Sequence, residues 1–316
     1  MKLVFCGTPT FAVPTLEALL AAGHEIPLVV SQPDRPVGRA QTLTASPVKQ
    51  VAQAAGLAVA QPEKIRSNAD FRGQLEAVAP DAIVVVAYGR ILPPWMLTLP
   101  SLGCINLHGS LLPKYRGAAP IQWSVAMGDA YTGNTTMLLE GGLDTGPILL
   151  QQTVEIPPDQ TAVELFDVLA KAGAPLVVET LACIAGGSIK PRPQNHEFAT
   201  FAPLLDREDG RMDFALRTAH ELYNHWRGFQ PWPGAFTTLE GKKLIVHRMT
   251  VAEADSVSVP APPLPGTIQA VNHRFFVACA GETWLELVEV QLEGKKRMAA
   301  AEFLRGTTPG ALARLG

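Results

Sequence analysis

Three polar side chains, two of them on one short segment, are suited to the attack of an amine on a carbonyl carbon. Asn106 and His108 stand two positions apart in the mainly apolar run 104–108, which has the pattern of a strand. Residues i and i+2 of a strand point to the same face, so we expect the amide and the imidazole to project together. Asp144 stands in the glycine-rich segment 140–146, whose backbone can approach a flat ligand closely.

Each of these groups has a role in such a reaction. Attack on a carbonyl develops negative charge on its oxygen, and Asn106 and His108 can each donate a hydrogen bond to it. One such donor contributes about 10²–10³ in rate. The Asp144 carboxylate can hold the imidazolium and accept the proton, directly or through water. Taken alone, the Asn-x-His pair also fits capping or turn hydrogen bonds, and Asp144 also fits an ordinary turn. Their combination predicts a catalytic site.

The loop that follows, 109–121, is predicted to wrap a ligand. It reads Gly-Ser-Leu-Leu-Pro-Lys-Tyr-Arg-Gly-Ala-Ala-Pro-Ile. This composition is too apolar for a solvated loop, and glycine and proline interrupt it too often for a helix. Ligand pockets are mainly apolar with a few placed polar groups. The loop therefore suits a flat, partly apolar ligand.

Residues 106–121 resemble the signature N-x-H-G-S-L-L-P-x-x-R-G-A-A-P-I of the 10-formyltetrahydrofolate formyltransferases, and 140–146 resembles the aspartate loop of that family. The resemblance extends over essentially the whole chain. It implies that Asn106, His108 and Asp144 are the catalytic groups. It also implies that 10-formyltetrahydrofolate donates the formyl group and that the reaction needs no metal.

Two segments are expected to contact the folate. The resemblance implies that the first lines the folate; it consists of Ser110, Leu111, Leu112 and Pro113. The second follows the aliphatic run 82–86, because chemistry in doubly wound sheets gathers at the carboxyl ends of the strands. It consists of Ala87, Tyr88 and Gly89.

The acceptor of the formyl group differs among branches of the family, which act on a purine precursor, an amino sugar nucleotide or methionyl-tRNA; a folate hydrolase-type domain also belongs to it. Segment 32–49 resembles the long loop that enters the acceptor end of the tRNA, and 117–122 matches the tRNA branch. Segment 229–234 and the length of the C-terminal half exclude the shorter purine enzyme. The resemblance therefore implies methionyl-initiator tRNA as the partner, in translation initiation. Its α-amino group suits the reaction, because α-amino pKa values lie near 7.7–8.0 in model peptides and esterification should lower them.

Three basic residues of segment 32–49 are predicted to contact the tRNA: Arg35, Arg39 and Lys49. Arg39 is expected to be the main contact, because 40–43 lacks the lysines that some relatives carry. Cations of the C-terminal half fit either a phosphate-facing patch or ordinary solvated turns. They are Lys242, Lys243, Arg248, Lys295, Lys296 and Arg297.

Two other functions stay open. The first is formyl transfer to an amino sugar nucleotide, against which the loop at 32–49 argues. The second is a catalytically inactive tRNA-binding or regulatory protein, against which the complete set of three catalytic groups argues.

The pattern of the first half predicts an α/β fold. The apolar runs 3–6, 26–30, 82–86 and 104–108 are typical of buried parallel strands, and helical spacing lies between them. This alternation indicates a doubly wound, Rossmann-like N-terminal domain. The turn 7–10 after the first strand is neither G-x-G-x-x-G nor a P-loop, so no nucleotide cofactor is expected.

The texture changes after a glycine- and proline-rich stretch near residue 190. Brief β-type runs separated by turns follow, and they predict a smaller C-terminal β-barrel of the OB-like kind. We therefore expect a formyltransferase catalytic domain over 1–188, a linker over 189–206 and a tRNA-binding domain over 207–316.

Composition limits the class of protein. The 316 residues are 47% hydrophobic and 17% charged, with a net charge of −3, which is typical of a globular protein and excludes a strongly basic one. No signal-peptide pattern and no apolar window near about 20 residues occur, so neither export nor a membrane partner is expected. The four cysteines lack zinc-ligand spacing and fit reduced core residues. We expect a cytoplasmic monomer without an obligate protein partner.

Overall fold

A computed structural model describes residues 1–38, 41–253, 256–257, 263–306 and 314–316. Contacts within the chain define two compact units. The first comprises Met1–Pro120, Tyr131–Ile156 and Glu164–Pro203. The second comprises Ile121–Ala130, Pro157–Val163 and Leu204–Gly316.

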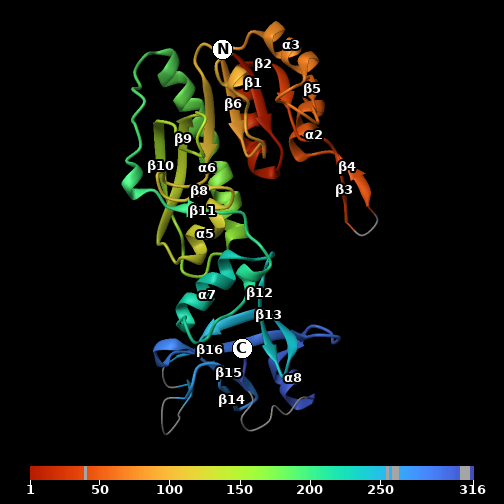
Figure 1. Cartoon of the computed structure of the whole chain (residues 1–316), viewed down its shortest axis with the longest axis vertical. Helices are drawn as coiled ribbons and strands as arrows, with labels where there is room; N and C mark the ends of the chain where they lie inside the picture. Colours follow the sequence, from red (N-terminus) through yellow and green to blue (C-terminus); the bar gives the residue numbers. More distant parts are fainter. Residues whose placement is uncertain (39–40, 254–255, 258–262, 307–313) are drawn as a thin grey trace. The chain divides into compact units, whose positions relative to one another are not determined.

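The first unit is built on a seven-stranded sheet (Figure 1). Its strands in spatial order are β10 (Ile148–Glu155), β9 (Tyr131–Leu138), β7 (Cys104–His108), β6 (Ala82–Val86), β1 (Lys2–Gly7), β2 (Glu25–Val30) and β5 (Val59–Ala60). The five strands from β7 to β5 pair in parallel, and β9 and β10 add an antiparallel edge. From β1 the chain first adds β2 and β5 on one side. It then returns to the other side of β1 and adds β6 and β7 there. This arrangement confirms the Rossmann-like class.

Helices cover both faces of this sheet because its strand residues alternate between them. On one face, Phe71 of α3 (Ala69–Val78) and Met96 of α4 (Pro94–Leu97) belong to the buried core under the sheet. Leu107 of β7 points to the opposite face, where it lies against Gly173 of the long helix α6. A Cβ atom on Gly173 would stand 2.7 Å from Cδ2 of Leu107.

Helix α6 (Ala162–Ala185) has 24 residues and is long and apolar enough, by length and composition, to cross a membrane. The core helix of a globular protein passes the same test, and Leu165 and Leu181 of α6 are fully buried. Asn134 of β9 donates a hydrogen bond from Nδ2 to the carbonyl of Leu169 over 2.9 Å. Polar contacts to the sheet of this kind identify α6 as a core helix of the first unit, whose other helices α1 (Val13–Ala21) and α2 (Pro47–Ala54) are shorter.

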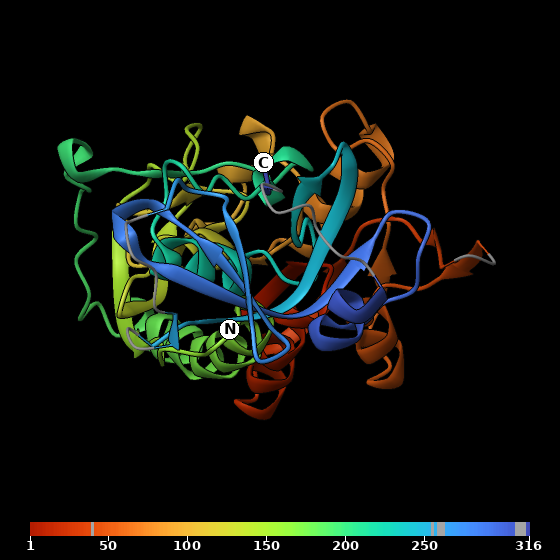
Figure 2. The same cartoon turned by 90° about the horizontal axis from the view of Figure 1, so that it is seen from below.

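The segment expected to form an inserted loop contains a β-hairpin. Strands β3 (Arg35–Val37) and β4 (Thr42–Thr44) pair antiparallel, and every residue of β4 is exposed. In Figures 1 and 2 the hairpin extends away from the seven-stranded sheet. An exposed hairpin that leaves the body of the unit is suited to contact a large ligand.

The end of the first unit returns to the loop that follows β7. Strand β11 (Phe201–Ala202) pairs in parallel with β8 (Arg116–Gly117), and the amide of Tyr115 donates a hydrogen bond to Oγ1 of Thr200 over 2.8 Å. Part of the segment predicted as a linker is thus anchored beside the loop predicted to wrap a ligand.

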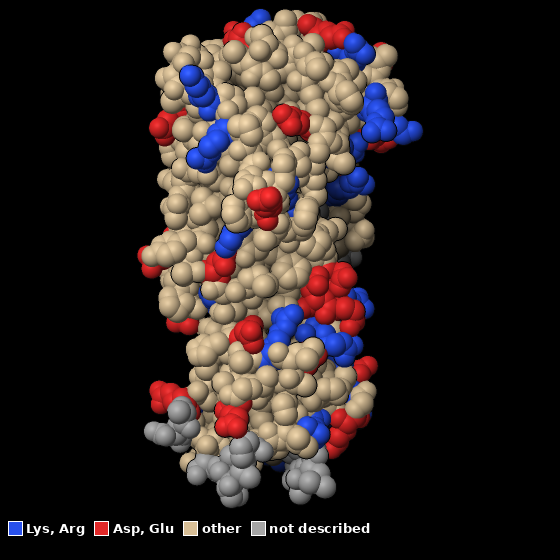
Figure 3. Space-filling view, turned by 60° about the vertical axis from the view of Figure 1, so that its left-hand side comes forward, with Lys and Arg blue, Asp and Glu red and all other residues tan. Residues whose placement is uncertain are grey.

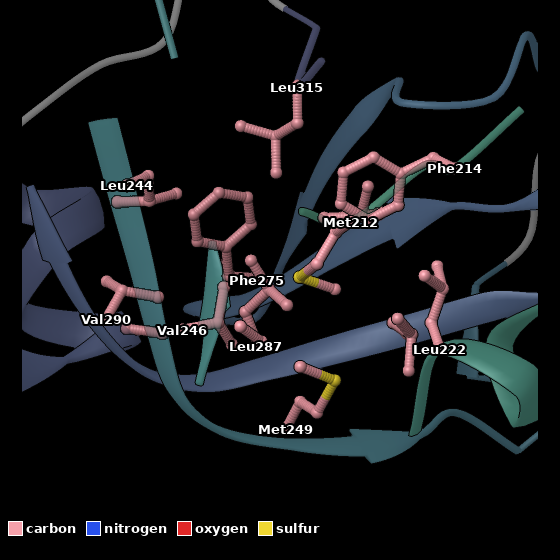
Figure 4. Packing of buried hydrophobic residues seen from close by; sticks show 14 of the residues in the cluster. Met212, Phe214, Leu222, Leu244, Val246, Met249, Phe275, Leu287, Val290 and Leu315 are labelled. Carbon is pink, nitrogen blue, oxygen red and sulfur yellow. The ribbon is translucent and has the colours of Figure 1, made fainter. Parts of the chain in front are cut away.

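The second unit holds an antiparallel sheet and two helices around one core (Figure 4). The strands are β12 (Ala235–Leu239), β13 (Lys242–Val251), β14 (Ile268–Val271), β15 (Arg274–Ala278), β16 (Trp284–Leu292) and β17 (Met298–Ala299). Helix α7 (Ala219–Gly228) begins at a capping box, in which Thr218 and Glu221 bond each other's backbone amides. Leu222 of α7 and Phe303 of α8 (Ala300–Gly306) belong to the core shared with these strands.

An OB-like β-barrel was expected for this unit; its described strands form the antiparallel path from β12 to β14, and the barrel is not closed. The gap between these two edges is bridged by the last residues of the chain. Leu315 forms a β-bridge with Leu239 of β12, and Arg314 forms one with Thr267, next to β14. A short segment therefore stands where direct pairing of the edges would close a barrel.

One short helix does not follow the expected division of the chain. Most of α5 (Pro120–Ala126) groups with the second unit, although it stands inside the expected catalytic domain. A Cβ atom on Gly228 of α7 would stand 2.6 Å from Cβ of Ala126, and Trp123 packs edge-to-face on Phe229 at 5.2 Å. The limits 1–188, 189–206 and 207–316 remain a prediction.

Candidate active site

The sheet brings His108 and Asp144 together. His108 is the last residue of β7, and the loop between β9 and β10 carries Asp144. Oδ2 of Asp144 lies 3.7 Å from Nδ1 of His108, and the two side chains are 15% and 6% exposed. An imidazole and a carboxylate, both largely shielded from solvent, therefore lie side by side at the carboxyl end of β7, the position that the sequence predicts for them.

The other ring nitrogen of His108 identifies its tautomer. Nε2 lies 2.9 Å from the carbonyl oxygen of Tyr115, which can only accept a hydrogen bond. Nε2 therefore carries a proton, and in the neutral imidazole Nδ1 holds the lone pair. The nitrogen facing Asp144 is thus the one free to take up a proton, and the resulting imidazolium would face a carboxylate.

Asp144 is held in an unusual conformation. Its φ of 49° lies in the left-handed region, which non-glycine residues seldom adopt. The backbone N–H of Gly117 donates a hydrogen bond to Oδ2 of Asp144 over 2.8 Å. The carboxylate is thus oriented by a backbone donor from the loop after β7 and by its position beside His108.

Asn106 stands on the same face of β7 as His108, because the two are i and i+2. It is half-buried. Its side-chain amide makes no hydrogen bond to another residue that the structure describes. An amide next to His108 with its donors free is placed to bind a developing oxyanion.

The four residues predicted to line the folate differ in accessibility. Ser110 and Leu112 are buried, and the Thr135 hydroxyl holds this turn: it donates to the carbonyl of Ser110 over 2.6 Å and accepts from the amide of Leu112 over 3.1 Å. Leu111 and Pro113 are half-buried and remain accessible to a ligand. Ser110 and Leu112 therefore shape the turn from within.

The second predicted folate segment comes next to His108. Val86 pairs with Leu107, so Ala87 and Gly89 leave the sheet beside the end of β7, and both are exposed. Tyr88 differs: its ring is buried in the core of the first unit, and burial raises the pKa of its phenol well above the ordinary value. Only the backbone of Tyr88 faces this edge, where its carbonyl accepts from Oγ1 of Thr8 over 3.1 Å.

The basic residues predicted to contact tRNA have different surroundings. Arg35 is exposed on β3. Nζ of Lys49 lies 2.7 Å from Oδ2 of Asp34 and 2.7 Å from Oε1 of Gln61, so it fixes the base of the hairpin. The hydrogen bonds from Gln61 and Lys49 lower the pKa of Asp34. Arg39 lies outside the described residues.

The cations of the second unit are partly engaged by their neighbours. Arg297 forms an ion pair with Glu289, and Nζ of Lys243 lies 3.8 Å from the centre of the Phe236 ring. On the face shown in Figure 3, basic and acidic side chains of the described residues are interspersed, without an extended basic field. The predicted phosphate-facing patch would therefore rest on a few local cations.

No group of three or more His, Cys, Asp or Glu side chains in the described part of the chain could hold a metal ion. The thiols of Cys6, Cys104 and Cys279 are buried, and burial raises the pKa of Cys104 and Cys279 to about 12. These cysteines are core residues, as predicted for Cys6 and Cys104 from the apolar runs around them.

One residue at the site was not predicted. Gln194 stands in the stretch interpreted as a linker, yet it is buried and donates hydrogen bonds to the carbonyls of Asp144 and Gly146. Nothing in the local sequence indicates this contact, because 50 positions separate Gln194 from Asp144.

Family models match both halves of the chain. The formyl transferase model matches residues 1–181, and the model of the formyl transferase C-terminal domain matches residues 204–308. Among relatives, the methionyl-tRNA formyltransferase of Acidobacterium capsulatum is 62% identical over 316 residues, which is 100% of either chain. That of Koribacter versatilis is 54% identical over 100% of this chain and 99% of its own.

Solved structures share the fold at low sequence identity. WlaRD, a sugar 3N-formyl transferase solved with dTDP and 5-N-formyl-THF, superposes with a TM-score of 0.63 at 17% identity, over 94% of this chain and 99% of its own. HypX from Aquifex aeolicus in complex with tetrahydrofolic acid gives 0.62 at 14%, over 96% of this chain and 47% of its own. Together with the matched models and relatives, these findings show that the chain belongs to the formyl transferase family.

Proposed function

We propose that this enzyme transfers the formyl group of 10-formyltetrahydrofolate to the α-amino group of methionyl-initiator tRNA, giving N-formylmethionyl-tRNA. The observation that carries the proposal is the approach of Asp144 to His108 at the end of β7, with Asn106 two positions before His108 on the same face of the strand. The high identity to methionyl-tRNA formyltransferases over the full chain supports the acceptor. The exposed β3–β4 hairpin supports a substrate much larger than an amino sugar.

The residues at the sheet edge fit a flat folate. Ala87 and Gly89 are exposed and have φ of 45° and 80°, which turns the chain sharply beside His108. The half-buried Leu111 and Pro113, in the loop that follows β7, add apolar surface. When bound, the folate supplies the formyl group, and the ring's apolar faces suit these residues.

The chain's own groups then share the work of the transfer. Asn106 donates a hydrogen bond from its free amide to the carbonyl oxygen as charge develops there. Nδ1 of His108 takes up the proton that the attacking amine must lose, since Nε2 is already protonated by its bond to Tyr115. Asp144 stabilises the imidazolium that results. The imidazolium then gives its proton to the folate nitrogen as that nitrogen leaves the formyl carbon. Arg35 and Lys49 are proposed to face the tRNA, with Lys49 acting through the base of the hairpin.

The test is an assay with three acceptors. Purified enzyme and 10-formyltetrahydrofolate are mixed with methionyl-initiator tRNA, methionyl-elongator tRNA or a dTDP-linked amino sugar, and the formylated products are quantified. Rapid transfer to the initiator tRNA alone is expected. Transfer to the amino sugar and to neither tRNA would replace the proposed acceptor with the sugar nucleotide.

We further propose that the enzyme acts as a cytoplasmic monomer without an obligate protein partner. Its free thiols suit a reducing compartment. Sedimentation velocity across a hundredfold range of concentration should give one species of the mass of a single chain. A dimer that persists at the lowest concentration would contradict this.

A further inference from the structure

We propose that Gln194 is a positioning residue that holds the Asp144 loop in its working conformation, linking it to the buried guanidinium of Arg116. The inference rests on the proposed function for Asp144, and it adds a residue that lies 50 positions away in the chain.

The primary amide of Gln194 is used at both ends. Its Nε2 donates to the carbonyl of Asp144 over 2.8 Å and to the carbonyl of Gly146 over 2.7 Å. Its Oε1 accepts from Nε and Nη2 of Arg116, over 3.1 and 2.6 Å. Two donors and one acceptor in a single planar group are what a primary amide offers, so no carboxylate or hydroxyl side chain could replace it.

Burial makes these hydrogen bonds count. Gln194 is 6% exposed and Arg116 4% exposed, so water cannot take over a bond that is lost. A buried polar group left without its partner destabilises the arrangement that holds it. One of the two carbonyls that Gln194 binds belongs to Asp144, whose φ of 49° must be held against its intrinsic preference; the other, of Gly146, lies two positions further along the same loop.

The hydrogen bond between Gln194 and Arg116 is one of three contacts that residues 115–117 make to the site. Residues 115–117 follow one another in the chain, and each makes a contact to this site. Tyr115 accepts from His108, Arg116 donates to Gln194, and Gly117 donates to Asp144. Gln194 thus ties the backbone of the Asp144 loop to Arg116, whose two chain neighbours bind the His108 ring and the Asp144 carboxylate. Releasing it should let Asp144 move away from His108.

The experiment is a double-mutant cycle with Gln194→Met and Asp144→Ala, measured as kcat and KM for methionyl-initiator tRNA. Methionine keeps the length of glutamine and makes neither set of hydrogen bonds. We expect Gln194→Met to lower kcat about 10–100-fold with KM within twofold, because displacement of a catalytic group by about 1 Å can cost 10². In the Asp144→Ala background the same change should cost little, since its effect runs through Asp144. An equal loss in both backgrounds, or unchanged kcat, would overturn the proposal.

A second variant and a control separate positioning from misfolding. Gln194→Glu keeps the acceptor for Arg116 and sets an oxygen against the two carbonyls, so it should lower kcat as much as Gln194→Met. Gln74→Met alters an exposed glutamine of α3 and should leave kcat unchanged. Each variant's thermal unfolding midpoint shows that the folded enzyme is compared.

A measurement without substrate makes failure of this inference distinct from failure of the proposed function. The Gly117 amide donates to Asp144, so its hydrogen exchange reports whether the loop is in place. Exchange at Gly117 should accelerate in Gln194→Met as it does in Asp144→Ala, and stay unchanged in Gln74→Met. Wild-type exchange at Gly117 in Gln194→Met would overturn the positioning role, whatever the acceptor of the formyl group.

Discussion

Oδ2 of Asp144 lies 3.7 Å from Nδ1 of His108, slightly too far for a hydrogen bond and close enough for an ion pair once the ring is protonated. This distance therefore suits the protonated, positively charged state of the His108 ring. The neutral ring is held in place by its other nitrogen, which donates to Tyr115.

Asp144→Asn tests this relationship. The asparagine carbonyl can still accept from Gly117, so the loop should stay in place while the charge is lost. We expect kcat to fall about 10²–10⁴-fold with KM for both substrates nearly unchanged. Single-turnover formylation measures it, with Asp70→Asn on the exposed start of α3 as the control. A loss below tenfold would show that Asp144 does not carry the proton transfer.

Asn106→Ala removes the proposed oxyanion donor. Because the donor acts on charge that develops only in the transition state, kcat should fall about 10²–10³-fold while folate binding persists. Asn106→Asp has nearly the same shape but puts a negative charge beside the developing oxyanion, so it should be at least as slow. Equal activity of the aspartate variant and the wild type would exclude the role.

Gly117→Ala should damage both fold and activity. Gly117 has a φ of 124°, and a Cβ atom there would stand 2.6 Å from the carbonyl oxygen of Ala202. We expect a loss of about 1–3 kcal/mol in unfolding free energy and a fall in kcat, since the Gly117 amide orients Asp144. Gly73→Ala in α3 is the matched control, with nothing within 4 Å of the added atom. There, alanine should be neutral or stabilise by about 0.5–1 kcal/mol.

Arg35→Ala addresses the acceptor. If Arg35 faces a phosphate, KM for methionyl-initiator tRNA should rise while KM for folate stays constant. The slope of log affinity against log salt should fall by about 1. Arg66→Ala, an exposed arginine of the same unit, controls for net charge. An unchanged salt slope would remove Arg35 from the interface.

His225 should make the second unit sensitive to acid. Its ring is buried against Phe229 at 4.3 Å, and burial, together with the charge of Arg217, lowers its pKa to about 3. The unfolded chain binds a proton near pH 6.5 and the folded one does not. Stability is therefore full above pH 6.5 and is lost as pH falls from there toward 3.

The corresponding loss between pH 7.5 and pH 5 is about 2 kcal/mol, at about 1.4 kcal/mol per pH unit. Urea unfolding of His225→Leu should lack this part of the pH dependence. His220→Leu, exposed in the same helix, should keep it. The same acid sensitivity in all three proteins would assign it to other groups.

Local patterns predicted the strands whose ends carry the proposed catalytic residues. The run 104–108 and the run 82–86 became β7 and β6 with the same limits, because unbroken aliphatics fit a sheet covered on both faces. The i and i+2 rule placed Asn106 and His108 on one face. The glycine-flanked Asp144 lies beside His108, and the catalytic role that the family resemblance implies for it stays a prediction.

What the sequence did not indicate depends on packing between distant segments. Tyr88 was predicted to meet the folate; its ring packs into the core of the first unit, so a folate contact through its backbone alone stays a prediction. Lys49 forms an ion pair with Asp34, and spacing alone could not predict this pairing. Gln194 looked like part of a linker, because proline-rich segments have the same local texture whether they are solvated or anchored.

The succession of contacts from residues 115–117 has a consequence for engineering. A stretch of three residues sets the spacing between two proposed catalytic groups, so inserting or deleting one residue there would shift the contacts to His108, Gln194 and Asp144 together. Transferring this activity to another scaffold would therefore require moving the end of β7, residues 115–117, the Asp144 loop and Gln194 together. A change of the molecule that accepts the formyl group, by contrast, could be attempted by redesigning the β3–β4 hairpin alone.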